Sequence, residues 1–282
     1  MKYFIKKVAL SLRFFISFLP SSFSVYISKK GFSFLAKQSP KITFVRKIFD
    51  TNLKIFAQSN YAVETQATSI IKNSNDIHYG IKSLNLKDFT MIDVGANVGI
   101  YSLAGIYLGA KKVYSFEPGP LYQKLVKNIE LNNLNHKIHA FKIAVGSKKT
   151  DMKYYEDQNN LGNAILVNDL KDLNMKHTDA KFNDNFINVK VEQLDTLNEM
   201  YDFKKIDLIK IDVEGMEYEV IKGANKIITE NLPIIVAETF LNMNLFRKNN
   251  SIENLFDFLY SHGYQSFQWK NKKFSKFVYP NI

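Results

Sequence analysis

Three charged residues spaced two apart stand out in the second half of the chain. Lys210, Asp212 and Glu214 fall at the carboxyl end of an apolar run that we predict to be a buried strand. Residues two apart on a strand share a face, and open parallel sheets bind ligands beyond the carboxyl ends of their strands. A carboxylate placed there can take the proton from an attacking hydroxyl. We therefore predict Asp212 or Glu214 as a general base, with Lys210 keeping the carboxylates ionised or contacting a polar acceptor.

A structural explanation competes for the same cluster, because negative charge near a helix start is stabilised by the helix dipole. For Glu217, close to the predicted helix start at Gly215, we prefer helix capping. For Asp212 we prefer catalysis, because Glu214 is closer to the predicted helix start and can cap the helix more easily than Asp212, the last strand residue. Asp212, Glu214 and Glu238 are also oxygen ligands suited to a divalent cation. Their spacing follows no metal motif, so we assign no metal.

A second candidate site lies where a buried strand turns into a helix. The run from Asp93 to Gly99, DVGANVG, predicts unpaired backbone N–H groups and a positive helix end beside a ligand. Glycine at 95 and 99 lets the backbone approach that ligand closely. Glu117 ends the next predicted strand, 18 residues after Gly99, where a carboxylate can accept both hydroxyls of a ribose. Together these features predict a site for a nucleoside cofactor.

The details of this turn favour one cofactor over another. A dinucleotide site needs the pattern G-x-G-x-x-G, and here Asn97 holds the place of the middle glycine. Asp93 would repel a pyrophosphate, whereas its charge suits the ammonium and sulfonium groups of S-adenosylmethionine. The residues therefore predict S-adenosylmethionine rather than NAD.

The elements that position these residues alternate between strand and helix. Short apolar runs bounded by glycine indicate buried parallel strands, and apolar residues at helical spacing indicate covering helices. We predict an α/β doubly wound, mostly parallel sheet with an antiparallel C-terminal hairpin at its edge. The predicted strands are 89–94, 112–116, 138–145, 206–213 and 233–239, the helices are 100–109, 121–133, 216–228 and 252–261, and the hairpin is 264–269 with 274–279.

The regular alternation breaks at about 147–191, where the sequence becomes polar and rich in Asn. We interpret this stretch as an inserted hairpin and loop lying over the sheet. Its length suits a lid or a substrate wall, although long insertions are also tolerated without any role.

Charge divides the chain at about residue 60. Residues 1–60 carry 11 of the 38 basic residues and one of the 27 acidic residues, which leaves 27 basic and 26 acidic residues in 61–282. We predict a basic, amphipathic helical extension at 1–60, including short helices over 25–57, and a nearly neutral catalytic domain at 61–282. A neutral domain argues against nucleic acid as a partner. The absence of cysteine excludes a thiol nucleophile and indicates an intracellular protein.

Residues 2–19 place apolar side chains on one face of a helix and basic ones opposite. Arg13 interrupts the apolar run, which makes it a poor membrane-spanning helix, and no A-x-A site supports a signal peptide. An anionic membrane surface binds such a helix, and packing on the body or on a second subunit explains the pattern equally well. We predict a cytoplasmic protein, peripheral on the inner membrane face if residues 1–20 bind it.

Four motifs resemble those of the FkbM-type methyltransferases over about residues 85–270. They are DVGANVG at 93–99, FEP at 116–118, LDTL at 194–197 and DLIKIDVEGMEYEVIKGA at 207–224. The resemblance implies a class I methyltransferase fold and methyl transfer to oxygen, often on a sugar, glycan or secondary metabolite. It also implies that the methionine end of the cofactor lies against Asp93, Gly95, Asn97 and Gly99, that Glu117 binds the ribose, and that the insertion borders the adenine.

Other functions remain as alternatives. A nicotinamide-dependent sugar-modifying enzyme would need G-x-G-x-x-G and a Tyr-x-x-x-Lys couple, and Tyr218 and Lys222 have that spacing on the wrong helix. A non-catalytic Rossmann-like binding module would have lost cofactor binding, against which the intact glycine turn argues. The sequence leaves open the acceptor, with carbohydrate preferred, and the choice between oxygen and nitrogen.

Overall fold

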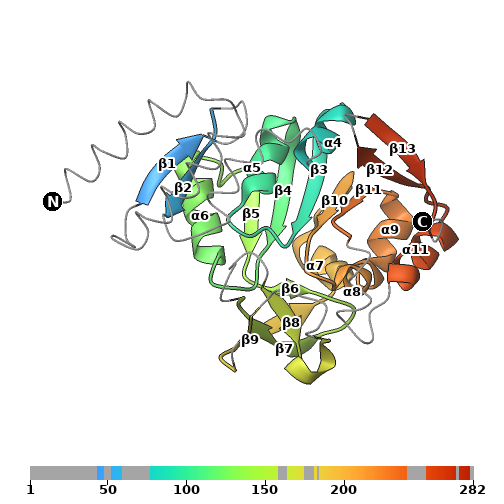
Figure 1. The fold of residues 1–282 in the computed structure, drawn as a ribbon. Coiled ribbons are helices and arrows are strands. Elements are labelled where there is room, and N and C mark those ends of the chain that lie inside the picture. Colours follow the sequence, from blue (N-terminus) through green and yellow to red (C-terminus); the bar gives the residue numbers. More distant parts are fainter. Residues whose placement is uncertain are drawn as a thin grey trace.

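The structure, a computed structural model, describes residues 43–47, 52–58, 77–157, 164–174, 181–182, 184–239, 252–270 and 273–279 (Figure 1). The helix predicted at 2–19 lies outside these residues. Among the described helices, none is long and apolar enough to cross a membrane.

A five-stranded parallel sheet forms the centre of the molecule, as predicted. Its strands are β3 (Phe89–Val94), β4 (Ala110–Phe116), β5 (Ile138–Phe141), β10 (Leu208–Ile211) and β11 (Ile234–Ala237). Their order is β11-β10-β3-β4-β5, and every neighbouring pair is parallel. The chain therefore winds outward from β3 through β4 to β5, then returns to β10 on the other side. This reversal between β3 and β10 is the position where open α/β sheets bind ligands.

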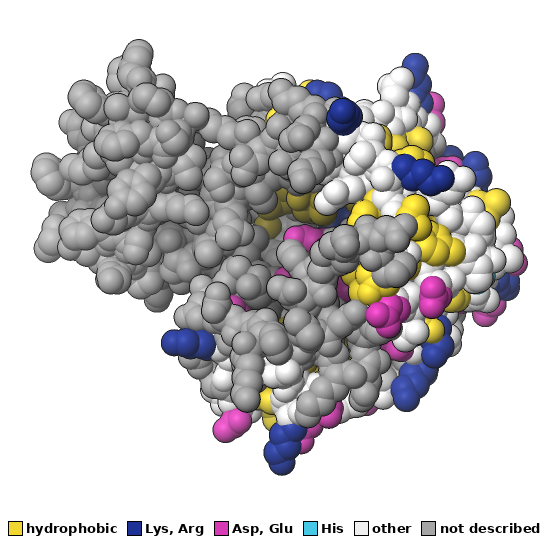
Figure 2. Space-filling model, turned by 45° about the vertical axis from the view of Figure 1, so that its right-hand side comes forward, with side chains coloured by type: hydrophobic (Ala, Val, Ile, Leu, Met, Phe, Trp, Pro, Cys, Tyr) yellow, Lys and Arg dark blue, Asp and Glu magenta, His cyan; other side chains and the backbone are white. Residues whose placement is uncertain are grey.

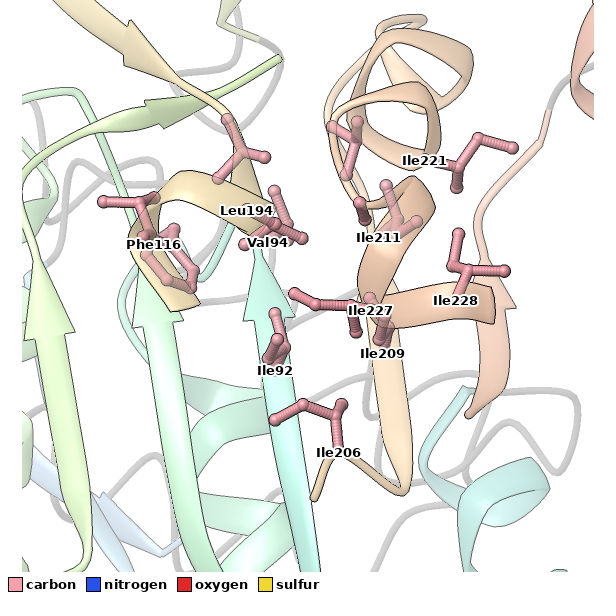
Figure 3. Close-up of a cluster of buried hydrophobic side chains, with 14 of the residues drawn as sticks. Ile92, Val94, Phe116, Leu194, Ile206, Ile209, Ile211, Ile221, Ile227 and Ile228 are labelled. Atoms are coloured by element: carbon pink, nitrogen blue, oxygen red, sulfur yellow. The ribbon is translucent and has the colours of Figure 1, made fainter. Parts of the chain in front are cut away.

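Helices cover both faces of this sheet because neighbouring strand residues point in opposite directions. On β3, Met91 packs into one buried cluster and Ile92 into another. The cluster of Met91 includes residues of α4 (Ile77–Ser83), α5 (Ile100–Tyr107) and α6 (Tyr122–Leu131). The cluster of Ile92 (Figure 3) includes residues of α7 (Leu194–Tyr201), α8 (Glu217–Lys222), α9 (Asn225–Asn231) and α11 (Ile252–Ser261). Each large apolar side chain so buried contributes about 1.5–3 kcal/mol.

Two predicted elements are each divided in the structure. The helix predicted at 216–228 is two helices, α8 and α9, separated at Gly223. A Cβ on Gly223 would lie 2.0 Å from the carbonyl oxygen of Gly146, so close packing requires glycine at this break. The strand predicted at 138–145 divides into β5 in the main sheet and β6 (Ala144–Val145) in a second sheet.

The second sheet contains the predicted insertion. It consists of β6, β7 (Thr150–Tyr155), β8 (Ile165–Val167) and β9 (Ile187–Glu192), in the order β6-β9-β7-β8. Strands β7 and β8 form the expected antiparallel hairpin, and a 3-10 helix, η2 (Leu170–Asp172), follows it. Because β7 also pairs with β9, the hairpin belongs to a sheet of its own, drawn below the main sheet in Figure 1.

The prediction of short helices over 25–57 is wrong where the structure describes this segment. Instead, β1 (Thr43–Lys47) and β2 (Lys54–Gln58) form an antiparallel hairpin, which agrees with the β-branched and aromatic residues there. The hairpin is anchored on α6, since the N–H of Lys54 donates to Asn132 Oδ1 at 2.9 Å and the Asn132 amide donates back to Lys54 O at 2.7 Å. Ile55 is fully buried in the same core as α5 and α6.

The C-terminal hairpin is present, but it is not an edge of the main sheet. Strands β12 (Ser266–Lys270) and β13 (Lys273–Phe277) pair only with each other among the described strands. The prediction of an antiparallel edge is therefore wrong, whereas the prediction of an antiparallel hairpin is confirmed. The hairpin contacts α4 instead, where Trp269 lies against Gly80.

Candidate active site

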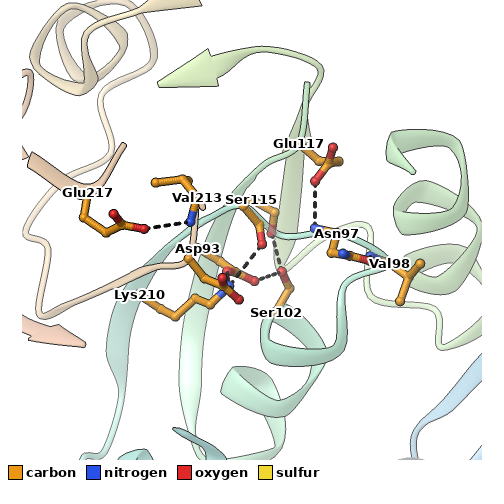
Figure 4. Close-up of polar contacts among 11 residues, drawn as sticks. Asp93, Asn97, Val98, Ser102, Ser115, Glu117, Lys210, Val213 and Glu217 are labelled. Atoms are coloured by element: carbon orange, nitrogen blue, oxygen red, sulfur yellow. Dashed lines mark hydrogen bonds and ion pairs between the residues drawn. The ribbon is translucent and has the colours of Figure 1, made fainter. Parts of the chain in front are cut away.

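A row of buried polar side chains crosses three neighbouring strands of the main sheet (Figure 4). The strand register pairs Lys210 of β10 with Asp93 of β3, and Asp93 with Ser115 of β4. Ser102 reaches the row from α5, donating to Asp93 Oδ2 at 2.5 Å and lying 2.8 Å from Ser115 Oγ. All four residues are buried. The helix and the three strands are thus tied together by polar contacts directly below the turn that follows β3.

Lys210 connects the two halves of the site. Its side chain is only 1% exposed, and its ammonium lies 3.2 Å from Asp93 Oδ1 and 3.4 Å from Asp212 Oδ2. It also donates a hydrogen bond of 3.0 Å to the carbonyl oxygen of Gly95. Burial lowers the pKa of Lys210, but the two carboxylates outweigh it and raise the pKa above the ordinary value. The buried ammonium is therefore charged, and it is placed to hold the carboxylates rather than to contact an acceptor.

The backbone N–H groups of the turn after β3 are not unpaired, which corrects the sequence prediction. Those of residues 95 and 96 both donate to the carbonyl oxygen of Phe116 at 3.0 Å. The other three also have acceptors within the protein: Glu117 Oε2 for Asn97, Asn97 Oδ1 for Val98 and Ala96 O for Gly99. The reason is that the turn crosses the end of β4, whose carbonyl and carboxylate oxygens take up its donors. This turn is therefore no cradle for a pyrophosphate.

The structure requires glycine at both positions of the turn after β3 where the sequence has it, 95 and 99. Gly95 has φ +74°, and a Cβ there would lie 1.9 Å from the carbonyl oxygen of Asp212. Gly99 has φ +90°, and its Cβ would lie 2.6 Å from Leu125 Cδ1. Asn97 adopts φ +54°, a left-handed conformation that asparagine tolerates well. The turn is thereby held close against the end of β10.

Glu117 is positioned by two backbone groups at the end of β4. Its Oε2 accepts from the N–H of Asn97 at 2.9 Å, and its Oε1 accepts from the N–H of Gly119 at 2.8 Å. Burial raises the pKa of this carboxyl to about 7, although both backbone hydrogen bonds and Lys210 act in the opposite direction. A carboxylate oxygen can accept more than one hydrogen bond. Each oxygen thus retains the capacity to accept a ribose hydroxyl.

The turn after β10 carries the predicted catalytic carboxylates. Asp212 is half-buried and contacts Lys210, while Glu214 lies in the turn with φ +52°. Glu217 is buried, and its Oε1 accepts from the N–H groups of Val213 at 3.3 Å and Gly215 at 3.1 Å. Glu217 therefore has a structural role, as the sequence favoured, but it binds the turn before α8 and does not cap the helix, whose N-cap Met216 makes no side-chain cap hydrogen bond. Asp212, whose ion pair is with Lys210, is the candidate base at this edge of the sheet.

No group of three or more His, Asp or Glu side chains gathers as metal ligands among the described residues. Asp212, Glu214 and Glu238 therefore form no such group.

Three residues of the site were not predicted. Ser115 stands opposite Asp93 in the sheet register, and Ser102 lies on α5 above it. Aligning the predicted strands at their carboxyl ends would have found Ser115, because residues one strand apart then share a face. Tyr154 comes from β7 of the second sheet, and a Cβ on Gly119 would lie 2.3 Å from its hydroxyl oxygen. No local signal links Tyr154 to this place.

The comparison that decides the family covers most of this site. The model of the methyltransferase FkbM domain matches residues 93–266, from Asp93 at the end of β3 to the start of β12. The chain belongs to the FkbM methyltransferase family. It is accordingly an S-adenosylmethionine-dependent methyltransferase, as the sequence predicted, and the nicotinamide alternative is set aside.

The chain is also similar to individual proteins, two of which are named methyltransferases. Methyltransferase sdnD of Sordaria araneosa is 30% identical over 207 residues, which are 64% of this chain and 78% of that protein. Methyltransferase 1 of Beauveria bassiana (strain ARSEF 2860) is 28% identical over 149 residues, 48% of this chain and 58% of that protein. A crystal structure of PRMT6 with SAH matches with a TM-score of 0.34 and 18% identity, over 56% of this chain and 40% of that one.

The residues of this FkbM domain fit the methyl donor. Glu117 offers a buried carboxylate with remaining acceptor capacity for the ribose, beside a turn that glycine holds close to the end of β10. Two carboxylates, Asp93 and Asp212, share the single Lys210 ammonium, so this cluster keeps a net negative charge, which suits a donor with a sulfonium and an ammonium group. The methionine end of the cofactor would lie against residues 95–99.

Proposed function

We propose that this methyltransferase acts on a hydroxyl group and that Asp212 takes the proton from it. The observation that carries the proposal is the position of Asp212, a half-exposed carboxylate at the sheet reversal between β3 and β10. Its backbone oxygen lies against Gly95 of the cofactor turn, so donor and acceptor would meet there. A hydroxyl must lose its proton during attack, and a positioned carboxylate can accept it.

The other residues have supporting roles in this proposal. S-adenosylmethionine, when bound, supplies a methyl group on a sulfonium sulfur and leaves as the neutral thioether. Lys210 fixes Asp212 by an ion pair, and its hydrogen bond to Gly95 O keeps the cofactor turn and the base at constant separation. Glu214, in the same turn as Asp212, would orient the acceptor. Fixed separation matters because displacement at the methyl carbon needs the attacking oxygen, the methyl group and the sulfur in line.

For the acceptor we propose a carbohydrate, as the family resemblance implies. The described residues on the face shown in Figure 2 give no support to a nucleic-acid partner. On the face shown in Figure 2, basic side chains of the described residues are scattered, and acidic side chains lie in a central hollow. A nucleic-acid backbone requires a stripe or patch of basic residues. Binding of an uncharged sugar requires no such patch of basic residues.

The test is methyl transfer from S-[methyl-³H]-adenosylmethionine to a panel of mono- and oligosaccharides, with amines and peptides as competing acceptors. We expect label on a sugar, and NMR of the product should show an O-methyl group. The Asp212→Asn variant should bind S-adenosylhomocysteine and transfer no label. Label on amines alone would overturn the hydroxyl assignment, and full turnover by Asp212→Asn would overturn the base.

We further propose that residues 1–20 attach the enzyme to an anionic membrane surface, on their amphipathic and basic pattern. Sedimentation with vesicles containing phosphatidylglycerol tests this. The full chain should sediment and a chain lacking residues 1–20 should not. Equal behaviour of the two chains would contradict the proposal.

A further inference from the structure

Tyr154 brings the second sheet into contact with the end of β4. It lies near the end of β7 and is only 6% exposed. A Cβ on Gly119 would lie 2.3 Å from both Cζ and the hydroxyl oxygen of Tyr154, so the phenol end rests on the Gly119 backbone. Gly119 is also the residue whose N–H binds Glu117 Oε1. The phenol is therefore a neighbour of the carboxylate assigned to the ribose.

The hydroxyl of Tyr154 makes no hydrogen bond to any residue in the part of the chain that the structure describes. The hydroxyl oxygen is not one of the fully enclosed unpaired polar atoms of the described residues, so it reaches solvent at the edge of a buried side chain, where a bound ligand can replace water. The groups around the Tyr154 hydroxyl determine which ligand group it can bind. Burial and the charge of Glu117 raise the pKa of Tyr154, so the phenol remains protonated at neutral pH and can donate.

A ribose hydroxyl complements this pair of residues. Each such hydroxyl donates one hydrogen bond and can accept others. The Glu117 carboxylate only accepts, so it satisfies the donor side of a ribose hydroxyl and leaves the acceptor side open. A tyrosine O–H directed at the same place supplies the missing donor.

We propose that Tyr154 donates a hydrogen bond to a ribose hydroxyl of S-adenosylmethionine. The inference rests on the assignment of Glu117 to the ribose and is independent of the acceptor. It gives the insertion a function, since β7 then forms a wall of the donor pocket. The second sheet would contribute to recognition of the nucleoside, and the acceptor would be bound elsewhere.

The test is calorimetric titration of the full chain with S-adenosylhomocysteine and with its 2′-deoxy and 3′-deoxy analogues. Tyr154→Phe removes one oxygen, and the matched control Tyr155→Phe removes the same atom on the opposite face of β7, where Tyr155 packs with Ile165, Val167 and Leu173. We expect Tyr154→Phe to weaken S-adenosylhomocysteine binding about three- to tenfold, and Tyr155→Phe to leave it unchanged.

The analogues identify the contact. One of them should bind the natural protein at least about three- to tenfold more weakly than S-adenosylhomocysteine, and Tyr154→Phe should reduce that difference to the part that the Glu117 contact contributes. Gly119→Ala is a second probe, because the added methyl forces the phenol end to move, and it should weaken binding by a similar factor.

Two results would contradict the inference and separate its failure from that of the site. If Tyr154→Phe binds S-adenosylhomocysteine like the natural protein while Glu117→Gln binds weakly, the ribose assignment stands and Tyr154 has no part in it. If Glu117→Gln also binds normally, the ribose lies elsewhere and both assignments are wrong.

Discussion

The two turns that flank the sheet reversal are built in opposite ways. In the turn after β3, residues 95–99, all five backbone N–H groups have acceptors and both glycines are held against other atoms. In the turn after β10, Asp212 is half-exposed and Glu214 adopts a left-handed conformation. The first turn is therefore a fixed support, and the second presents charged side chains. A methyltransferase needs both, because the donor must be held still while the acceptor loses a proton.

Lys210 joins the two turns, since its ammonium pairs with Asp212 and donates to Gly95 O, and substitutions in this connection or in either turn test the comparison.

Lys210→Met should have the largest effect. It leaves Asp93 buried without its cation, and breaking a buried pair in this way costs about 3–5 kcal/mol of unfolding free energy. Denaturant unfolding measures the change. The control Lys190→Met breaks an exposed pair with Asp151, where less than about 1 kcal/mol is expected. Equal losses in the two variants would show that the buried row does not stabilise the site.

Gly95→Ala should destabilise the protein by about 2–4 kcal/mol, through left-handed strain and overlap with Asp212 O. It should also weaken binding of S-adenosylhomocysteine. Gly263→Ala separates the two causes, because Gly263 has φ +80° and no atom within 4 Å of its added Cβ. That control should show only the strain, about 1–2 kcal/mol. Thermal unfolding of both variants makes the comparison.

Asp212→Asn should lower turnover at least about 100-fold, the usual contribution of a general base. Binding of S-adenosylhomocysteine should change less than about threefold, since Asp212 belongs to the second turn. Asp151→Asn, in the exposed pair with Lys190, is the matched control and should keep full turnover. A large loss of cofactor affinity in Asp212→Asn would instead place this residue in the donor site.

The pH dependence of cofactor binding should be the smallest of these effects. The pKa of Glu117 is about 7, so the carboxyl is mostly protonated at pH 6 and mostly ionised at pH 8. If Glu117 binds the ribose as proposed, the ionised form accepts both hydroxyls, and S-adenosylhomocysteine should bind up to about tenfold more weakly at pH 6. Glu117→Gln should bind weakly at both values, with no such dependence.

Stability of the free protein should change in the opposite direction over the same range. Because the native pKa of Glu117 lies above its unfolded value of 4.5, the native state binds more protons between these values. The contribution of Glu117 to stability is therefore present below pH 4.5 and is lost as pH rises through about 7. Comparing the unfolding free energy of the natural protein with that of Glu117→Gln at pH 5 and pH 8 isolates this term.

The main sheet could be predicted from the sequence because its signals are local. An apolar run ending at Gly95 marked β3, a short apolar run marked β4, and helical spacing marked α6 and α11. The predictions failed where tertiary contacts override such signals. The predicted strand 138–145 is divided because β6 pairs in the second sheet and β5 in the main sheet. The predicted helix 216–228 is divided into α8 and α9, where Gly223 packs on Gly146.

The sequence by itself determined which residues gather at the reversal between β3 and β10. Asp93, Glu117, Lys210 and Asp212 all lie within one residue of the carboxyl end of a parallel strand, and parallel strands bring these ends to one edge. Only the tertiary structure decided what each of them contacts. Lys210 is buried between two carboxylates. The first turn crosses the end of β4, where its backbone N–H groups find acceptors. The contact of Tyr154 with Gly119 joins two sheets, and no spacing along the chain encodes such a contact.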